Sequence, residues 1–131
     1  MKSLEFHHIG VACKDIESET KISMNLGYEI EGEDFIDPVQ GVSGRFLVGG
    51  GPRLELLAPL TEKGVLTPWL NQGVKLYHLA YLTDELESEI QRLRASRAKV
   101  MVPPIPAVAF GGRKIAFLML PNMLLVELIE K

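Results

Sequence analysis

Hydrophobic and polar residues follow the same order twice along the chain, at positions about 70 residues apart. Leu4–Cys13 and Leu76–Leu82 are strand-like segments, and each is followed by an acidic segment. In the second acidic segment Leu86, Ile90 and Leu93 fall on one side at helical spacing. The helical period of the first acidic segment is weak, so its assignment as a helix depends partly on its match to the second.

Residue chemistry marks the ends of both expected helices. Asp15 is the expected N-cap of the first helix and Gly27 its stop, and Thr83 is able to cap the second. Three β-like segments follow each helix, with turn residues between them. They are Tyr28–Glu31, Arg45–Val48 and Arg53–Leu57 in the first half, and Lys99–Val102, Lys114–Leu120 and Leu124–Ile129 in the second.

The two halves align closely enough to indicate an internal duplication. Asp15–Thr20 aligns with Glu85–Ile90 at an offset of 85 − 15 = 70, and Leu54–Leu57 aligns with Val126–Ile129 at 126 − 54 = 72. A further match pairs Gly44-Arg45 with Gly112-Arg113 at 112 − 44 = 68. Different loop lengths produce such drift. The prediction is an α+β fold of two βαβββ modules.

The expected boundaries follow from this alignment. Residues 1–131 form one domain, with a first module at 1–60, a connector at 61–73 and a second module at 74–131. Glu33–Gly44 and Pro103–Gly112 are the long loops of the two modules, and both are apolar enough to cover a pocket.

Composition narrows the class of protein. The chain has 131 residues, a formal net charge of −3 and one cysteine, Cys13, so it offers no general attraction to nucleic acid or anionic membranes and cannot form an internal disulfide. The segment from Met1 to Phe6 lacks the apolar core of a signal peptide, and no run is long enough to span a bilayer. We expect a cytoplasmic protein.

Four polar residues lie at equivalent places in the duplicated pattern. His8 precedes the small residues Gly10 and Ala12 on its face of the first strand, and His78 occupies the same place in the second half. Glu55 and Glu127 each lie between two aliphatic residues, where a buried and unpaired carboxylate is costly. A divalent cation held by both histidines and both glutamates resolves this cost.

Each of these residues has an ordinary interpretation when taken alone, and their joint recurrence favours the metal site. By contrast, His7 aligns with Tyr77 and is interpreted as a packing residue, and Cys13 as a small core residue. The helical acids are interpreted as a solvated face; they are Glu17, Glu19, Glu87 and Glu89.

The motifs around these four residues resemble those of the vicinal oxygen chelate superfamily, which includes glyoxalases, bleomycin resistance proteins and extradiol dioxygenases. They are His7-His8-Ile9-Gly10-Val11-Ala12, Leu54-Glu55-Leu56-Leu57-Ala58-Pro59-Leu60, Tyr77-His78-Leu79-Ala80-Tyr81 and Val126-Glu127-Leu128-Ile129. Their spacing is most similar to that of the methylmalonyl-CoA epimerases. The resemblance implies a U-shaped, metal-lined cleft, a homodimer and a small-molecule substrate such as an acyl-CoA or a thiol adduct.

The resemblance also implies roles for individual residues. His8, Glu55, His78 and Glu127 fall on the four metal positions, for one Zn, Ni, Co, Mn or Fe ion per chain, and Glu127 is the first choice for proton transfer. A second catalytic glutamate usually follows a Gln-Gly-Val segment in such epimerases, but here that position is Gly44. Glu55 is the expected substitute. The next residue, Arg45, either binds a substrate carboxylate or phosphate or is a surface arginine.

These features favour a metal-dependent isomerase or lyase that acts through a metal-stabilised enolate, with chemistry like that of methylmalonyl-CoA epimerase. A lactoylglutathione lyase (glyoxalase I) is the second hypothesis, because it does not need the missing glutamate. A dioxygenase is disfavoured, since four protein ligands leave few open positions for O₂. A non-catalytic binding or resistance protein is the alternative from a different class, and the full ligand set counts against it.

Overall fold

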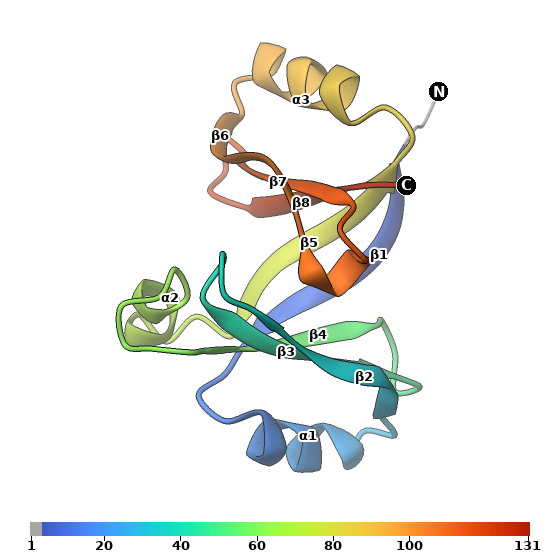
Figure 1. The fold of residues 1–131 in the computed structure, drawn as a ribbon, viewed down its shortest axis with the longest axis vertical. Helices are drawn as coiled ribbons and strands as arrows, with labels where there is room; N and C mark the ends of the chain where they lie inside the picture. The colour runs from blue at the N-terminus through green and yellow to red at the C-terminus, as the bar shows by residue number, and fades with distance from the viewer. Residues whose placement is uncertain (1–3) are drawn as a thin grey trace. The chain divides into compact units, whose positions relative to one another are not determined.

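The computed structural model describes residues 4–131. Residues 1–3, where the first module was expected to begin and where the segment inspected for a signal peptide starts, lie outside the described residues. The chain is α+β, as predicted, and its elements follow the order βαβββ twice (Figure 1). The first set is β1 (Leu4–Ala12), α1 (Ile16–Met24), β2 (Glu29–Asp37), β3 (Val42–Val48) and β4 (Leu54–Pro59). The second is β5 (Leu76–Thr83), α3 (Leu86–Ala95), β6 (Lys99–Pro106), β7 (Lys114–Met119) and β8 (Leu125–Glu130).

Two short helical elements add to this pattern. A helix, α2 (Thr67–Asn71), lies in the expected connector, and a 3₁₀ turn, η1 (Val108–Phe110), follows β6. Neither was predicted, because five and three residues are too few to show a hydrophobic period. Within residues 4–131 none of the helices has the length and apolarity that crossing a bilayer requires.

Local interactions explain where the two longer helices begin and end. Asp15 caps α1 as predicted: its Oδ2 accepts a hydrogen bond from the Ser18 backbone N–H at 3.0 Å. Gly27, beyond the last turn, has a φ of 95°, which favours glycine. In the second half the N-cap is Glu85 and not Thr83; the Thr83 hydroxyl instead accepts from the Glu85 N–H at 3.0 Å, in the turn that leads into α3.

The strands are hydrogen-bonded in the order β2-β3-β4-β1-β5-β8-β7-β6. In each module the first and last strands are parallel neighbours, and the pairing of Gly10 with Glu55 recurs as Ala80 with Glu127. These pairs have offsets of 80 − 10 = 70 and 127 − 55 = 72, which confirms the two main alignments of the repeat.

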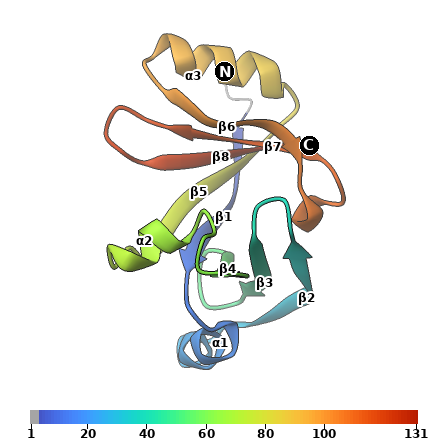
Figure 2. The ribbon, with the colours of Figure 1, turned by 60° about the vertical axis from the view of Figure 1, so that its left-hand side comes forward.

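The described residues divide into two compact units that do not follow the midpoint of the sequence. One unit is His8–Tyr77, and the other combines residues 4–7 with His78–Lys131. The change of unit therefore falls inside β1 and again inside β5. Each unit keeps one helix against its own strands, α1 over β2, β3 and β4, and α3 over β6 and β8 (Figures 1 and 2).

Each unit has its own hydrophobic core under its helix. The core below α1 contains Val11, Leu47 and Leu56, and the core below α3 contains Ile90 and Leu128 with their neighbours. Leu56 and Leu128, which follow the two glutamates, are both fully buried. The residue after each glutamate therefore faces a core, and the glutamate itself lies on the opposite face of the strand.

The expected long loops are mostly strand, which corrects the prediction. β2 continues to Asp37 and β3 begins at Val42, so only residues 38–41 turn; there the Asp37 Oδ1 accepts from the N–H groups of Val39 and Gln40, both at 3.1 Å. Similarly β6 runs through Pro103 and Pro104. It is an edge strand of the sheet, where proline is tolerated because one side needs no N–H donors.

The match of Gly44-Arg45 to Gly112-Arg113 is wrong. Arg45 pairs with Leu56 across β3 and β4, and the corresponding pair across β7 and β8 is Ala116 with Leu128. The structural equivalent of Arg45 is therefore Ala116. Two shared letters in a glycine-containing segment were too short a match to fix the register.

We predict that Leu56→Ala lowers the free energy of unfolding by about 2–5 kcal/mol, because it leaves a cavity in a close-packed core. Leu26→Ala in the same unit is the matched control, since Leu26 is 71% exposed, and its effect should stay within about 0.5 kcal/mol. Urea unfolding of both variants measures the difference. Equal effects would contradict the assignment of Leu56 to the core.

Candidate metal site

The first predicted pair of ligands is formed in the first module. His8 lies on β1 and Glu55 on β4, and the His8 Nε2 is 3.1 Å from the Glu55 Oε1. Both residues are buried, His8 completely. The parallel pairing of β1 with β4 brings them together: Glu55 pairs with Gly10, two residues beyond His8 on the same face of β1.

The second module repeats this arrangement. His78 on β5 places its Nε2 3.1 Å from the Oε1 of Glu127 on β8, and both residues are about 3% exposed. Glu127 pairs with Ala80, two residues beyond His78. Each module therefore places one of the predicted histidines next to one of the predicted glutamates.

A phenylalanine accompanies each pair, and no local sequence motif connects either one with the histidines. Phe46 pairs with Glu55 across β3 and β4, and its ring packs edge-on against His8 at 5.4 Å and 78°. Phe117 pairs with Glu127 across β7 and β8, and it packs against His78 at 5.1 Å and 82°. Comparing the β3 and β7 segments at an offset of 71 would have revealed this match.

The chemistry of these donors fits a divalent ion. His8 and Glu55 in one unit, and His78 and Glu127 in the other, are all buried, and each could offer a metal ion one nitrogen or carboxylate oxygen. Imidazole and carboxylate suit Zn and the neighbouring transition metals. Two buried carboxylates also carry a charge near −2 when ionised, which such an ion compensates.

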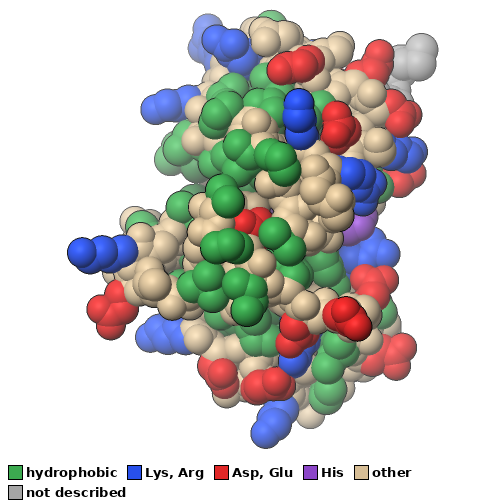
Figure 3. Space-filling view, in the orientation of Figure 1, with side chains coloured by type: hydrophobic (Ala, Val, Ile, Leu, Met, Phe, Trp, Pro, Cys, Tyr) green, Lys and Arg blue, Asp and Glu red, His purple; other side chains and the backbone are tan. Residues whose placement is uncertain are grey.

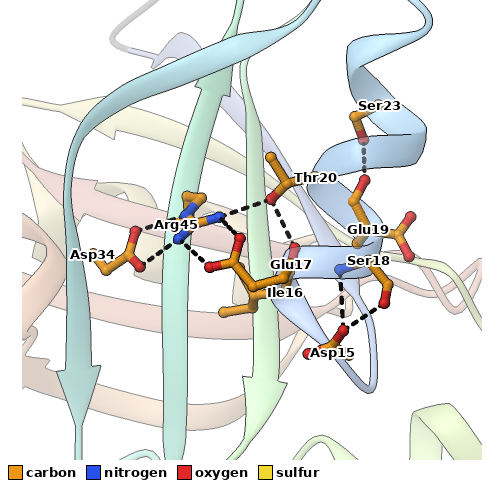
Figure 4. Close-up of polar contacts among 9 residues, drawn as sticks. All are labelled: Asp15, Ile16, Glu17, Ser18, Glu19, Thr20, Ser23, Asp34 and Arg45. Atoms are coloured by element: carbon orange, nitrogen blue, oxygen red, sulfur yellow. Dashed lines mark hydrogen bonds and ion pairs between the residues drawn. The ribbon is translucent and has the colours of Figure 1, made fainter.

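Arg45 lies on the other face of the sheet, so the expectation of a cation in the metal-lined cleft is corrected. Arg45 pairs with Leu56 and points to α1, whereas its neighbour Phe46 pairs with Glu55. Its guanidinium contacts Glu17 and Thr20 of α1 and Asp34 of β2 (Figure 4).

All five N–H donors of Arg45 find acceptors within its own module. The Nε and Nη2 donate to the two carboxylate oxygens of Asp34 at 2.7 and 2.8 Å, and Nη1 and Nη2 donate to the two oxygens of Glu17 at 3.0 Å each. The fifth donor, on Nη1, reaches the Thr20 hydroxyl at 3.1 Å. Arg45 thus fastens α1 to β2 and β3, and these contacts take up the guanidinium that was expected to bind substrate.

Gly44, the position of the missing glutamate, is covered by an aromatic ring. A Cβ on Gly44 would lie 2.1 Å from the Phe35 Cζ. Phe35 pairs with Gly44 across β2 and β3, and its ring lies 5.9 Å from that of Phe46. A larger residue at Gly44 would therefore have to displace Phe35.

The helical acids are not simply a solvated face, which corrects a second expectation. Glu17 binds Arg45, and Glu19 accepts from Lys75 at 2.8 Å. Glu89 is buried and accepts from Arg92 at 2.9 Å. On the face that Figure 3 shows, Lys and Arg side chains lie scattered among Asp and Glu.

His7 and Cys13, which were interpreted as packing residues, pack as expected. His7 packs edge-on against Phe110 at 5.6 Å. Cys13 is buried, its thiol donates to the Leu57 carbonyl at 3.5 Å, and burial raises its pKa to about 11, so that it stays a protonated thiol at neutral pH.

Comparison with known proteins agrees with this arrangement. The profile of the Glyoxalase/Bleomycin resistance protein/Dioxygenase superfamily matches residues 7–117, and the chain belongs to that superfamily. An ethylmalonyl-CoA/methylmalonyl-CoA epimerase from Cereibacter sphaeroides is 27% identical over 115 residues, 86% of this chain and 85% of that protein.

Solved structures lead to the same group of proteins. A hypothetical protein from Bacillus halodurans is 28% identical with a TM-score of 0.84, covering 99% of this chain and 96% of its own. A variant methylmalonyl-CoA epimerase from Streptomyces coelicolor, in complex with 2-nitronate-propionyl-CoA, is 25% identical with a TM-score of 0.81 and 99% coverage of both chains.

The Arg45 cluster predicts a dependence of stability on pH. Hydrogen bonds from Arg45 hold the pKa of Asp34 below its ordinary 3.8 and that of Glu17 below its ordinary 4.5. The stabilisation is therefore present above these ordinary values and is lost as the pH falls through the lowered ones. Asp34→Asn should lower the melting temperature by a few degrees at pH 7, and the difference from wild type should shrink toward pH 2.

Glu33→Gln is the matched control for Asp34→Asn, because Glu33 is the exposed neighbour on the same strand. Thermal melts from pH 2 to 7 make the comparison. A deficit in Asp34→Asn that stays constant down to pH 2 would argue against the ion cluster as its cause.

Proposed function

We propose that the chain is a divalent-metal-dependent epimerase that moves a proton at the carbon next to the carbonyl of an acyl thioester. His8, Glu55, His78 and Glu127 would hold the metal ion. The single observation that carries the proposal is the duplicated, buried pair of a histidine and a glutamate, 3.1 Å apart in each module. The similarity to epimerases of ethylmalonyl-CoA and methylmalonyl-CoA supports the substrate class. The homodimer stays a prediction.

The burial of the two glutamates supports a role in proton transfer. When bound, a divalent ion supplies Lewis-acid stabilisation for the negative charge that develops on a substrate oxygen. A carboxylate oxygen of Glu127 then accepts the proton from the adjacent carbon. Because Glu127 is about 3% exposed, a proton on its carboxyl group exchanges little with bulk water.

Epimerisation needs a second proton carrier, since the proton leaves one face of the carbon and returns to the other. Gly44 offers no carboxylate, and the Phe35 ring covers its Cα. Glu55 is the equivalent of Glu127 in the other module, and it has the same histidine contact and a similar burial. We therefore assign the second proton transfer to Glu55.

The metal is tested by elemental analysis of protein purified without chelators. We expect about one divalent ion per chain in the wild type, and its loss in His8→Ala and Glu127→Ala. The metal should also raise stability, by about 2.7 kcal/mol at a free concentration 100 times its Kd.

Two neighbours provide matched controls for the metal measurement. His7→Ala changes the adjacent histidine, and Glu130→Ala changes an exposed glutamate on the same strand as Glu127. Both variants should keep the ion. A folded wild type that binds none, or equal loss in His7→Ala and His8→Ala, would refute the site.

The reaction is tested with methylmalonyl-CoA in D₂O, followed by NMR. We expect deuterium to enter the carbon next to the thioester without net conversion. Glu127→Gln and Glu55→Gln should each slow this exchange by roughly 10²–10⁴-fold, as expected for loss of a positioned acid or base, while Glu130→Gln should not.

A parallel incubation with methylglyoxal and glutathione examines the second hypothesis, a lactoylglutathione lyase. Specific support for the lyase is the absence of a carboxylate at Gly44, because that reaction does not require it. Thioester formation without exchange into methylmalonyl-CoA would replace the epimerase proposal with the lyase.

A further inference from the structure

We propose that Phe46 and Phe117 are positioning residues that fix the ring planes of His8 and His78 for metal binding. The inference rests on the proposed metal site and adds to it a residue from β3 and a residue from β7. It concerns how the ligands are held, because neither phenylalanine offers an atom to a metal ion.

Phe46 contacts one member of its pair and lies directly across from the other. Its backbone pairs with Glu55, and its ring packs edge-on against His8. A single side chain on β3 thus fills the space beside a histidine from β1 and a glutamate from β4. Because His8 is completely buried, the direction of its ring is set by such neighbours and not by solvent.

The same arrangement is built independently in the second module. Phe117 pairs with Glu127 and packs against His78, with ring distance and angle close to those of the first module. The offset of the phenylalanines is 117 − 46 = 71, between the 70 of the histidines and the 72 of the glutamates. An aromatic ring occupies this place in both modules, although the equivalent of the neighbouring Arg45 is Ala116.

The geometry explains why a ring is needed there. The lone pair of an imidazole nitrogen lies in the plane of the ring, so rotation of the ring turns the Nε2 away from a metal ion. Edge-on aromatic contacts favour one relative orientation of the two rings, which an aliphatic side chain does not. Mutation of the hydrogen-bonding partners that orient a ligand histidine typically costs about 10–100-fold in metal affinity, and we take the same range for rings that orient it by packing.

Phe46 has a support of its own, which depends on Gly44. The ring of Phe35 lies 5.9 Å from that of Phe46 and directly over Gly44. The order of contacts is therefore Phe35, Phe46 and His8. Gly44 belongs to this set because any side chain there would push Phe35 out of its place.

The test uses Co²⁺ as the probe, with affinity measured by chelator competition and ligand geometry by visible absorption. Phe46→Leu and Phe117→Leu keep an apolar side chain and remove the ring. We expect each to weaken Co²⁺ binding about 10–100-fold and to alter the absorption bands. Phe110→Leu is the matched control: Phe110 packs edge-on against His7, which is not a proposed ligand, so Co²⁺ binding should not change.

The role of Phe35 and Gly44 is tested with the variants Gly44→Ala and Phe35→Leu, singly and combined. These variants also test the inference if Phe46→Leu does not fold. Gly44→Ala should weaken Co²⁺ binding, and it should add no further loss in a Phe35→Leu background, because its effect passes through that ring. Thermal melts of the metal-free variants show that each is folded.

The outcomes separate this inference from the metal site itself. No Co²⁺ binding by the wild type overturns the proposed function and the inference with it. Tight binding by the wild type with unchanged affinity and spectra in Phe46→Leu and Phe117→Leu overturns the inference alone. An equal loss in Phe110→Leu also overturns it, since a general packing effect would then suffice.

Discussion

The burial of a carboxylate in the middle of a β-sheet is the constraint on which the rest of this molecule depends. Glu55 and Glu127 are 4% and 3% exposed, and each lies among aliphatic strand neighbours. An ionised group in that position needs a compensating partner. The surroundings of each glutamate meet that need. In both modules a histidine lies next to the glutamate, a small residue pairs with it on one side, and a phenylalanine pairs with it on the other.

The two faces of the sheet differ in how closely the modules match. On the face of the glutamates both modules have the histidine, the glutamate and the phenylalanine at equivalent places, from His8 and His78 to Phe46 and Phe117. On the helix-covered face they differ: the first module holds Arg45 in an ion cluster, whereas the second has Ala116 in an apolar core. A core accepts many combinations of side chains that fill its volume, but a ligand set does not.

The sequence predicted the parts of the structure that leave a periodic or repeated pattern. The two βαβββ modules, the Asp15 cap and the equivalence of His8 with His78 and of Glu55 with Glu127 were expected from spacing and alternation. The position of Arg45 was not, because it was inferred from its place next to Gly44, and adjacent residues of a strand point to opposite faces of the sheet.

Other features depend on contacts that no local pattern records. The ends of the two long strands pair with their neighbours, residues 35–37 with β3 and residues 105–106 with β7, which overrides the turn preference of the prolines in β6. The contact of each phenylalanine with a histidine joins residues 38 or 39 positions apart, since 46 − 8 = 38 and 117 − 78 = 39. Only the register of three strands brings them together.

Each of the two units contains the start of a strand that belongs to the other repeat of the sequence. One unit takes residues 4–7 from the start of β1, and the other takes Leu76 and Tyr77 from the start of β5. A single copy of the repeat therefore lacks a stretch of strand that its unit takes from the other copy. A cut within the connector at residues 61–73 would separate each unit from a segment of chain that belongs to it.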